Sequence, residues 1–204
     1  MKKQNILFAL IMAVSFTVNA QGYQVGDKAS DFNLKNVTGE NLSLYNYADA
    51  EKGAIVIFTC NHCPYAIAYE DRIIELDKTF REKGYPVIAI NPNDPEIAPE
   101  DSFEKMIERA KEKSFPFPYL FDEKQEVYKI YGATRTPHVY LLKKEGQDFK
   151  VAYIGTIDDN YKDAGQVSKK YLADAVNALL DNKKPDPDFT KAIGCSIKDK
   201  STKK

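Results

Sequence analysis

Two cysteines separated by two residues, Cys60 and Cys63, have the spacing of redox-active dithiols. An apolar, strand-forming run at residues 54–59 precedes them, and an amphipathic segment at residues 65–83 follows at once. We therefore expect Cys60 at the N-terminus of a helix and Cys63 about one turn further in. Unpaired N–H groups and the helix dipole favour a negative charge at that place. Thiols so placed titrate at roughly 3.5 to 7.5 instead of near 8.5.

This arrangement predicts thiol–disulfide exchange. The Cys60 thiolate would attack a substrate disulfide, a mixed disulfide would form, and Cys63 would resolve it. His62 lies between the two cysteines, can titrate near neutral pH, and favours a neighbouring thiolate when it is charged. The alternative for His62 is an exposed ring with no catalytic part. A purely structural disulfide is disfavoured, because its loop is too short to restrain much entropy of the unfolded chain.

The third cysteine, Cys195, lies in a polar C-terminal tail and has two open interpretations. It is either a thiol without a role or a partner that folds back to form a disulfide with an active-site cysteine. A disulfide needs Cα atoms within about 7 Å, and the position in the sequence does not decide whether this is met.

The first twenty residues have the features of a secretory signal. Lys2 and Lys3 stand at the start, an apolar run covers residues 6–18, and the small residue Ala20 ends the segment. The run is shorter than the about 20 residues that span a bilayer, so stable membrane insertion is not expected. We expect cleavage after Ala20 and a periplasmic or secreted protein. The formal net charge of −1 gives no electrostatic reason to expect nucleic acid as a partner.

Strand and helix patterns alternate along the rest of the chain, which favours an α/β fold with a sheet that contains both parallel and antiparallel strands. We expect one domain over residues 21–182, followed by a C-terminal tail at residues 183–204. The expected strands are an N-terminal hairpin at 31–34 and 42–44, and further strands at 54–59, 86–90, 137–142 and 149–154. The expected helices cover 65–83, a segment from 101 or 102 onward, 123–131 and 167–180, and residues 115–122 are expected to be extended because of their prolines.

In this order of elements the chain resembles the thioredoxin superfamily and, more narrowly, the exported thioredoxin-like proteins grouped with the AhpC/TSA peroxiredoxins. The resemblance is carried by residues 58–65, 119–122, 131–138, 155–160 and 194–198, which together span most of the chain. It implies a thioredoxin fold, that is, a mixed central sheet flanked by helices, with an N-terminal β-hairpin and an inserted strand/helix segment. It also implies disulfide-containing protein substrates or small thiol or peroxide substrates, a redox partner, and no bound cofactor.

The resemblance assigns a role to Pro137. It implies a cis peptide bond before this proline, packed against the two cysteines, with the neighbouring backbone open to pair with the disulfide segment of a substrate. Two features depart from the family pattern: Thr59 stands where tryptophan usually precedes the first cysteine, and Ala54 stands where thioredoxin has a buried acid. The group that accepts the proton of the buried thiol is therefore open.

A peroxidase is a second possible function. The peroxidatic cysteine of peroxiredoxins corresponds to Cys63, and Arg135 falls where the family has an arginine whose charge favours the thiolate. Against this reaction, Cys60 stands where peroxiredoxins have threonine, and Val56 stands where they have proline.

A carrier of a soft metal is the third possible function. Cys60, Cys63 and His138, together with His62, offer thiolate and imidazole ligands of the kind that such metals prefer. The spacing of the cysteines is that of redox motifs, so we expect no metal.

Overall fold

The computed structural model describes residues 22–202, so the predicted secretory signal lies outside the described residues. Its central sheet is built from β1 (Asn33–Asn36), β2 (Asn41–Ser43), β3 (Gly53–Phe58), β4 (Val87–Asn91), β5 (Tyr119–Phe121), β7 (His138–Glu145) and β8 (Asp148–Gly155). The order across this seven-stranded sheet is β2-β1-β5-β4-β3-β7-β8. Strands β3, β4 and β5 are parallel, and the remaining pairs are antiparallel.

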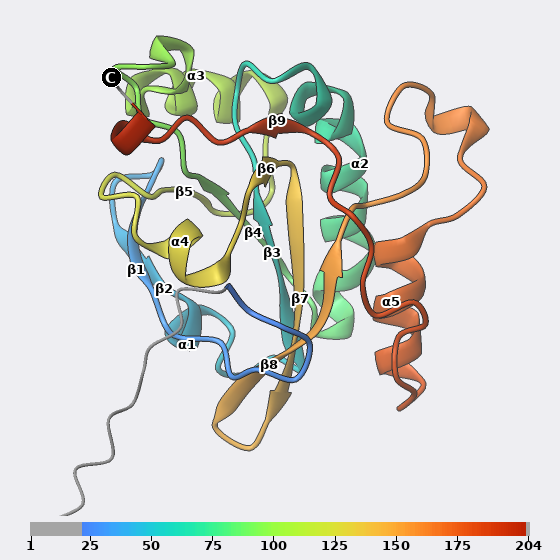
Figure 1. The fold of residues 1–204 in the computed structure, drawn as a ribbon. Helices are drawn as coiled ribbons and strands as arrows, with labels where there is room; N and C mark the ends of the chain where they lie inside the picture. The colour runs from blue at the N-terminus through green and yellow to red at the C-terminus, as the bar shows by residue number, and fades with distance from the viewer. Residues whose placement is uncertain (1–21, 203–204) are drawn as a thin grey trace, which may run out of the picture.

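The helices are α1 (Leu44–Tyr47), α2 (Pro64–Phe80), α3 (Phe103–Lys113), α4 (Val127–Tyr131) and α5 (Tyr171–Leu180). Helices α2 and α5 cover one face of the sheet, and α1 and α4 cover the other (Figure 1). The N-terminal hairpin is present as β1 and β2, and the inserted strand/helix segment is present as β5 and α4. The predicted fold class is therefore confirmed.

The central strand β3 is buried along its whole length, as its continuous apolar sequence predicts for a strand covered on both faces. Side chains of a strand point alternately to its two faces. Ile55 and Ile57 accordingly join the core under α2 and α5, whereas Val56 and Phe58 join the core under α1 and α4. This double burial fixes where β3 ends, and so where the cysteine motif begins.

Helix α2 begins within one residue of its predicted start at residue 65, but the two cysteines lie differently relative to it. Pro64 is its first residue and Cys63 is its N-cap, so Cys60 precedes the helix instead of starting it. Proline suits the first helical position because its missing N–H would have no partner there, and its fixed φ matches the helix. The expectation that Cys60 lies at the helix end and Cys63 one turn inside it is wrong.

Two further elements differ from the expectations. Helix α5 begins at Tyr171 instead of near residue 167, because Asp163 caps a separate 3-10 turn over Ala164–Gln166. The tail also contains a short strand, β9 (Cys195–Ser196), which pairs with β6 (Arg135–Thr136) in a second, two-stranded sheet. Among residues 22–202, no helix is both long enough and apolar enough to cross a bilayer.

Candidate active site

The two cysteines of the motif lie together at the N-terminus of α2. Cys60 follows the end of β3 and is 3% exposed, whereas Cys63 is fully buried. Both are free thiols. The Cys60 sulfur lies 3.2 Å from Thr136 Oγ1, and the Cys63 sulfur lies 3.2 Å from the Thr136 carbonyl oxygen. Thr136 therefore contacts both sulfurs, from the end of β6.

The peptide bond between Thr136 and Pro137 is cis, as the resemblance implied. The backbone next to the proline, however, is not open. Thr136 pairs with Cys195 of β9, and Arg135 pairs with Ser196, so the tail of the chain occupies the edge expected for a substrate.

The surroundings of Cys63 favour its thiolate form. The Cys60 thiol donates a hydrogen bond to Cys63 and, with smaller contributions from the Cys195 thiol and the Ala66 N–H, lowers the Cys63 pKa to about 4 despite burial. The Thr136 carbonyl opposes this, since it can only accept from a protonated Cys63. Because the donors outnumber this single acceptor and stand at a helix N-terminus, we assign the negative charge to Cys63.

The pKa of Cys60 is raised. Its thiol donates to Cys63, burial disfavours its charged form, and the negative charge of Asp101 adds to both effects. The reduced pair thus shares one proton, which stays on Cys60 while Cys63 carries the charge.

A buried carboxylate stands beside the motif, although Ala54 replaces the acid of thioredoxin. Asp101 is fully buried and accepts hydrogen bonds from the Asn61 backbone N–H at 2.7 Å and from Asn93 Nδ2 at 2.7 Å. His62 Nδ1 lies 2.6 Å from the second carboxylate oxygen of Asp101. The carboxylate therefore fixes the loop between the cysteines and orients the His62 ring.

Cys60, His62 and Asp101 place their possible ligand atoms within 4.8 Å of one another. Both oxygens of Asp101 already accept hydrogen bonds, so this cluster is satisfied as a hydrogen-bond network. From the sequence, Asp101 is expected only as a possible start of a helix. No spacing pattern connects it to Cys60, and only the fold brings the two together.

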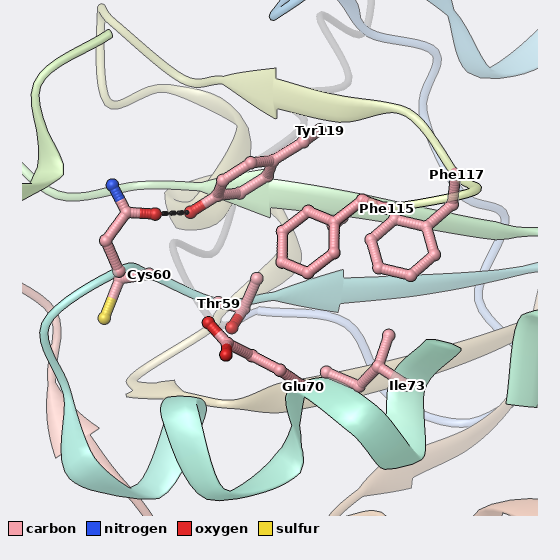
Figure 2. Close-up of a pocket in the computed structure, with 9 residues that line it drawn as sticks. Thr59, Cys60, Glu70, Ile73, Phe115, Phe117 and Tyr119 are labelled. Atoms are coloured by element: carbon pink, nitrogen blue, oxygen red, sulfur yellow. Dashed lines mark hydrogen bonds between the residues drawn. The ribbon is translucent and has the colours of Figure 1, made fainter. Parts of the chain in front are cut away.

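A small pocket opens behind Cys60, lined by the inner face of α2 and by aromatic rings from β5 and the segment before it. Figure 2 shows Cys60 at one end of this pocket, Phe117 at the other, and Glu70 reaching in from α2 between them. Glu70 is 4% exposed, and its carboxylate accepts two hydrogen bonds of 2.7 Å from the Arg109 guanidinium. The bidentate pair neutralises a charge that would otherwise be buried near the cysteines.

Replacing Arg109 with methionine should lower the free energy of unfolding by about 3 kcal/mol, because the Glu70 carboxylate would stay buried without its bidentate partner. Lys113 Nζ, 3.5 Å from Glu70, compensates only in part. Urea unfolding measures the change. The matched control is Glu112→Ala, which removes only the exposed partner of Arg109 and should change stability by less than about 0.5 kcal/mol. Equal effects of the two variants would contradict this account of Glu70.

His138 and Arg135 do not join the cysteines. His138 is buried on β7, where its Nδ1 accepts a hydrogen bond of 3.3 Å from the Thr134 N–H and its ring lies 4.9 Å from that of Tyr140. It lines a different hollow, together with Arg135 and Phe189. Arg135 is exposed, and its charge only partly opposes burial and Cys63, which together raise the pKa of Cys195 to about 11. The contacts of these two residues favour neither the metal carrier nor the peroxidase.

Burial lowers the pKa of His138 from 6.5 to about 4. Between these values the unfolded chain binds a proton that the folded chain does not, so stability should rise with pH, by at most about 1.4 kcal/mol per unit. His138→Phe keeps an aromatic ring and removes this titration. Urea unfolding of both proteins from about pH 4 to about pH 7 should therefore give a steeper dependence for the wild type. Parallel profiles would show that His138 is not buried in its neutral form.

Strand β3, the dithiol, α2 and the cis-proline opposite define a protein of the thioredoxin superfamily. The profile of the AhpC/TSA family matches residues 25–153, and the chain belongs to this family. Among curated relatives, the thiol-disulfide oxidoreductase ResA of Bacillus thuringiensis subsp. konkukian is 28% identical over 163 residues, covering 72% of this chain and 87% of ResA. ResA of Geobacillus thermodenitrificans is 28% identical over 167 residues, covering 74% of this chain and 89% of that ResA.

Solved structures are similar over more of the chain. A conserved protein from Geobacillus kaustophilus is 38% identical with a TM-score of 0.77, covering 88% of this chain and 94% of that protein. A protein from Sinorhizobium meliloti is 30% identical with a TM-score of 0.79, covering 87% and 96%. The exposed lipoprotein thioredoxin Etrx1 of Streptococcus pneumoniae, 21% identical with a TM-score of 0.55, covers 75% of this chain and 99% of its own, and it shares the fold.

Proposed function

We propose that the protein is a thiol–disulfide oxidoreductase that works through the Cys60–Cys63 pair. The observation that carries this proposal is that two buried sulfurs, one of them belonging to the N-cap residue of α2, both lie against Thr136 before a cis-proline. The relatives named thiol-disulfide oxidoreductase ResA support the same activity.

The electrostatics of the pair suggest the order of events. The Cys63 thiolate attacks one sulfur of a substrate disulfide, and the other substrate sulfur leaves as a thiolate. Cys60 then loses its proton and attacks the Cys63 sulfur in the mixed disulfide, which releases the second substrate thiol and leaves Cys60 and Cys63 joined. This order reverses the roles that the sequence predicts for the two cysteines, because the stabilised charge lies on Cys63.

We assign the open role of proton acceptor to His62, oriented by Asp101. The ring nitrogen of His62 lies within 4.8 Å of the Cys60 sulfur, a gap that one water molecule can bridge, and its side chain is 30% exposed, so the proton has a route to solvent. Glu70 is held by Arg109 and is less suited to move a proton.

The substrates that fit this chemistry are disulfides of proteins or small thiol compounds, with a second redox protein restoring the pair. An extracytoplasmic location is consistent with the basic and apolar leader of the sequence. Peroxide reduction by Cys63 is less favoured, since Cys60 and Val56 stand where peroxiredoxins have threonine and proline.

Equilibration of the protein in thiol–disulfide buffers tests the proposal, with the Cys60–Cys63 disulfide quantified by mass spectrometry. We expect a reversible two-electron couple. A stabilised Cys63 thiolate favours the reduced form, so the potential should be less negative than the roughly −270 mV of thioredoxin. The absence of a reversible couple, together with consumption of peroxide by Cys60→Ser, would replace this function with the peroxidase.

A further inference from the structure

The C-terminal tail returns to the active site and ends beside it. Figure 1 shows the chain leaving α5 and crossing the sheet to β9, next to β6 and the start of α2. There Cys195 lies opposite Thr136 in an antiparallel pair. Thr136 is the residue that contacts both active-site sulfurs, so the tail adds a strand, with a cysteine in it, at the edge where a substrate segment would pair.

Cys195 contacts Cys63 in particular. Cys195 packs against the small cluster formed by Cys60, Cys63 and Ala66, and its thiol and backbone N–H lie close enough to Cys63 to favour the Cys63 thiolate. Thiols that pack against one another in this way can reach the length of a disulfide by a local movement of the tail.

The tail before Cys195 is fitted closely to the active site. A Cβ atom on Gly194 would lie 2.2 Å from the Thr136 carbonyl oxygen, which is backbone and cannot rotate away. Only glycine lets the tail approach the cis-proline segment this closely.

The tail after Cys195 is held by buried polar groups of the loops that follow β4 and β5. The Lys198 N–H donates to Asn93 Oδ1 at 2.8 Å, and the Lys198 carbonyl accepts from Gln125 Nε2 at 2.8 Å and from the Asp94 N–H at 2.9 Å. Asn93, Asp94 and Gln125 are each at most 3% exposed. Since buried polar groups need partners, the tail is part of the folded domain.

We propose that Cys195 is a third redox-active cysteine, which forms a disulfide with Cys63 and so locks the tail over the active site. This inference rests on the proposed function of the Cys60–Cys63 pair. In the oxidised protein the Cys195 thiolate attacks the Cys63 sulfur, the Cys63–Cys195 bond forms and the Cys60–Cys63 bond breaks. Cys60 leaves as a thiolate and takes up the proton that Cys195 lost, so no net oxidation occurs.

The tail would then have two roles. Strand β9 protects the site from reaction with thiols other than the substrate, because it covers the Cys60–Cys63 pair until a substrate displaces it. It also supplies an internal partner in place of a substrate, at a local concentration that a free thiol does not reach.

Oxidation of Cys60→Ser with diamide tests the proposal, since this variant keeps only Cys63 and Cys195. We expect a monomeric product with a Cys63–Cys195 disulfide, identified by peptide mapping. The matched control moves the thiol by one residue, in Cys60→Ser/Cys195→Ser/Ser196→Cys. Adjacent strand residues point to opposite faces, so its disulfide should form at least about tenfold more slowly. Equal rates, a disulfide only between molecules, or two free thiols in Cys60→Ser would overturn the proposal.

Two more variants separate this proposal from the function on which it rests. Gly194→Ala, made in the Cys60→Ser background, should slow formation of the Cys63–Cys195 disulfide by about tenfold, because the added Cβ pushes β9 away from Thr136. An unchanged rate would overturn the close fit of the tail. Cys195→Ser should still form the Cys60–Cys63 disulfide. If Cys195→Ser forms the Cys60–Cys63 disulfide while Cys60→Ser forms no Cys63–Cys195 disulfide, only the proposal of a third redox-active cysteine fails. If Cys195→Ser forms no Cys60–Cys63 disulfide, the proposed function fails.

Discussion

Replacing Cys63 with serine should lower the rate of disulfide exchange by about 10³-fold or more, which is the scale of loss when an enzyme loses its nucleophile. The hydroxyl of serine does not ionise near neutral pH, so the donors around position 63 would have no thiolate to stabilise. Reduction of a disulfide-containing test protein, with excess dithiol as the source of electrons, measures the rate.

Cys60→Ser/Cys195→Ser is the comparison that assigns the roles within the pair. It should also stop turnover, but it should accumulate a mixed disulfide between Cys63 and the substrate, because both neighbouring thiols that could resolve it are missing. Trapping of the substrate on Cys60 in Cys63→Ser, with none on Cys63 in Cys60→Ser/Cys195→Ser, would contradict the order proposed above and restore Cys60 as the nucleophile.

Replacing Asp101 with alanine should lower the free energy of unfolding by about 3 kcal/mol and disorder the loop between the cysteines. The substitution leaves the Asn61 N–H and the Asn93 amide without an acceptor, and each unpaired buried donor costs about 1–3 kcal/mol. Chemical unfolding measures the loss. Asp71→Ala is the control, because the Asp71 side chain is 85% exposed and forms an ion pair with Lys113. This variant should stay within about 0.5 kcal/mol of the wild type.

Asp101→Asn separates the effect of the negative charge of this residue from the effect of its size and shape. The negative charge of Asp101 raises the pKa of Cys60, so its removal should lower that pKa and speed the alkylation of Cys60 at neutral pH. The rate is measured by mass spectrometry of the labelled peptides. Slower alkylation of Cys60 in Asp101→Asn than in the wild type would show that the carboxylate acts on Cys60 in some other way.

Much of the fold was predictable because local patterns and tertiary burial agree. The apolar run of β3 reads as a strand covered on both faces, and the alternation of its side chains between two cores explains that pattern. The hairpin of β1 and β2, the strand/helix insertion and the cis-proline all followed from the order of the elements or from the resemblance.

The positions of the two cysteines relative to the start of α2 were predicted wrongly, although the sequence carried a signal for them. Pro64 favours the first position of a helix, which makes Cys63 the N-cap and moves the helix end from one cysteine to the other. The end of the apolar run at residue 59 predicts instead that Cys60 lies at the helix N-terminus. This has a chemical consequence, because the backbone N–H donors at the helix N-terminus stabilise the thiolate of Cys63.

Asp101 and Cys195 could not be placed from the sequence. Asp101 is 41 residues beyond Cys60 and reaches it only because parallel strands β3 and β4 end at the same edge of the sheet. Cys195 reaches Cys63 through a tail of polar residues without a strand pattern, and its position depends on single contacts with Asn93 and Gln125. Long-range contacts of this kind leave no periodicity in the sequence.

The central claim is that Cys63 is a thiolate in the reduced protein, stabilised by its neighbours at the N-terminus of α2. The ultraviolet absorbance of thiolates, followed during a pH titration of the reduced protein, measures this directly. We expect one thiolate with an apparent pKa near 4, present at neutral pH and absent from Cys63→Ser. A titration in which all three thiols ionise at about pH 8.5 or above, in the wild type as in the variant, would contradict the account.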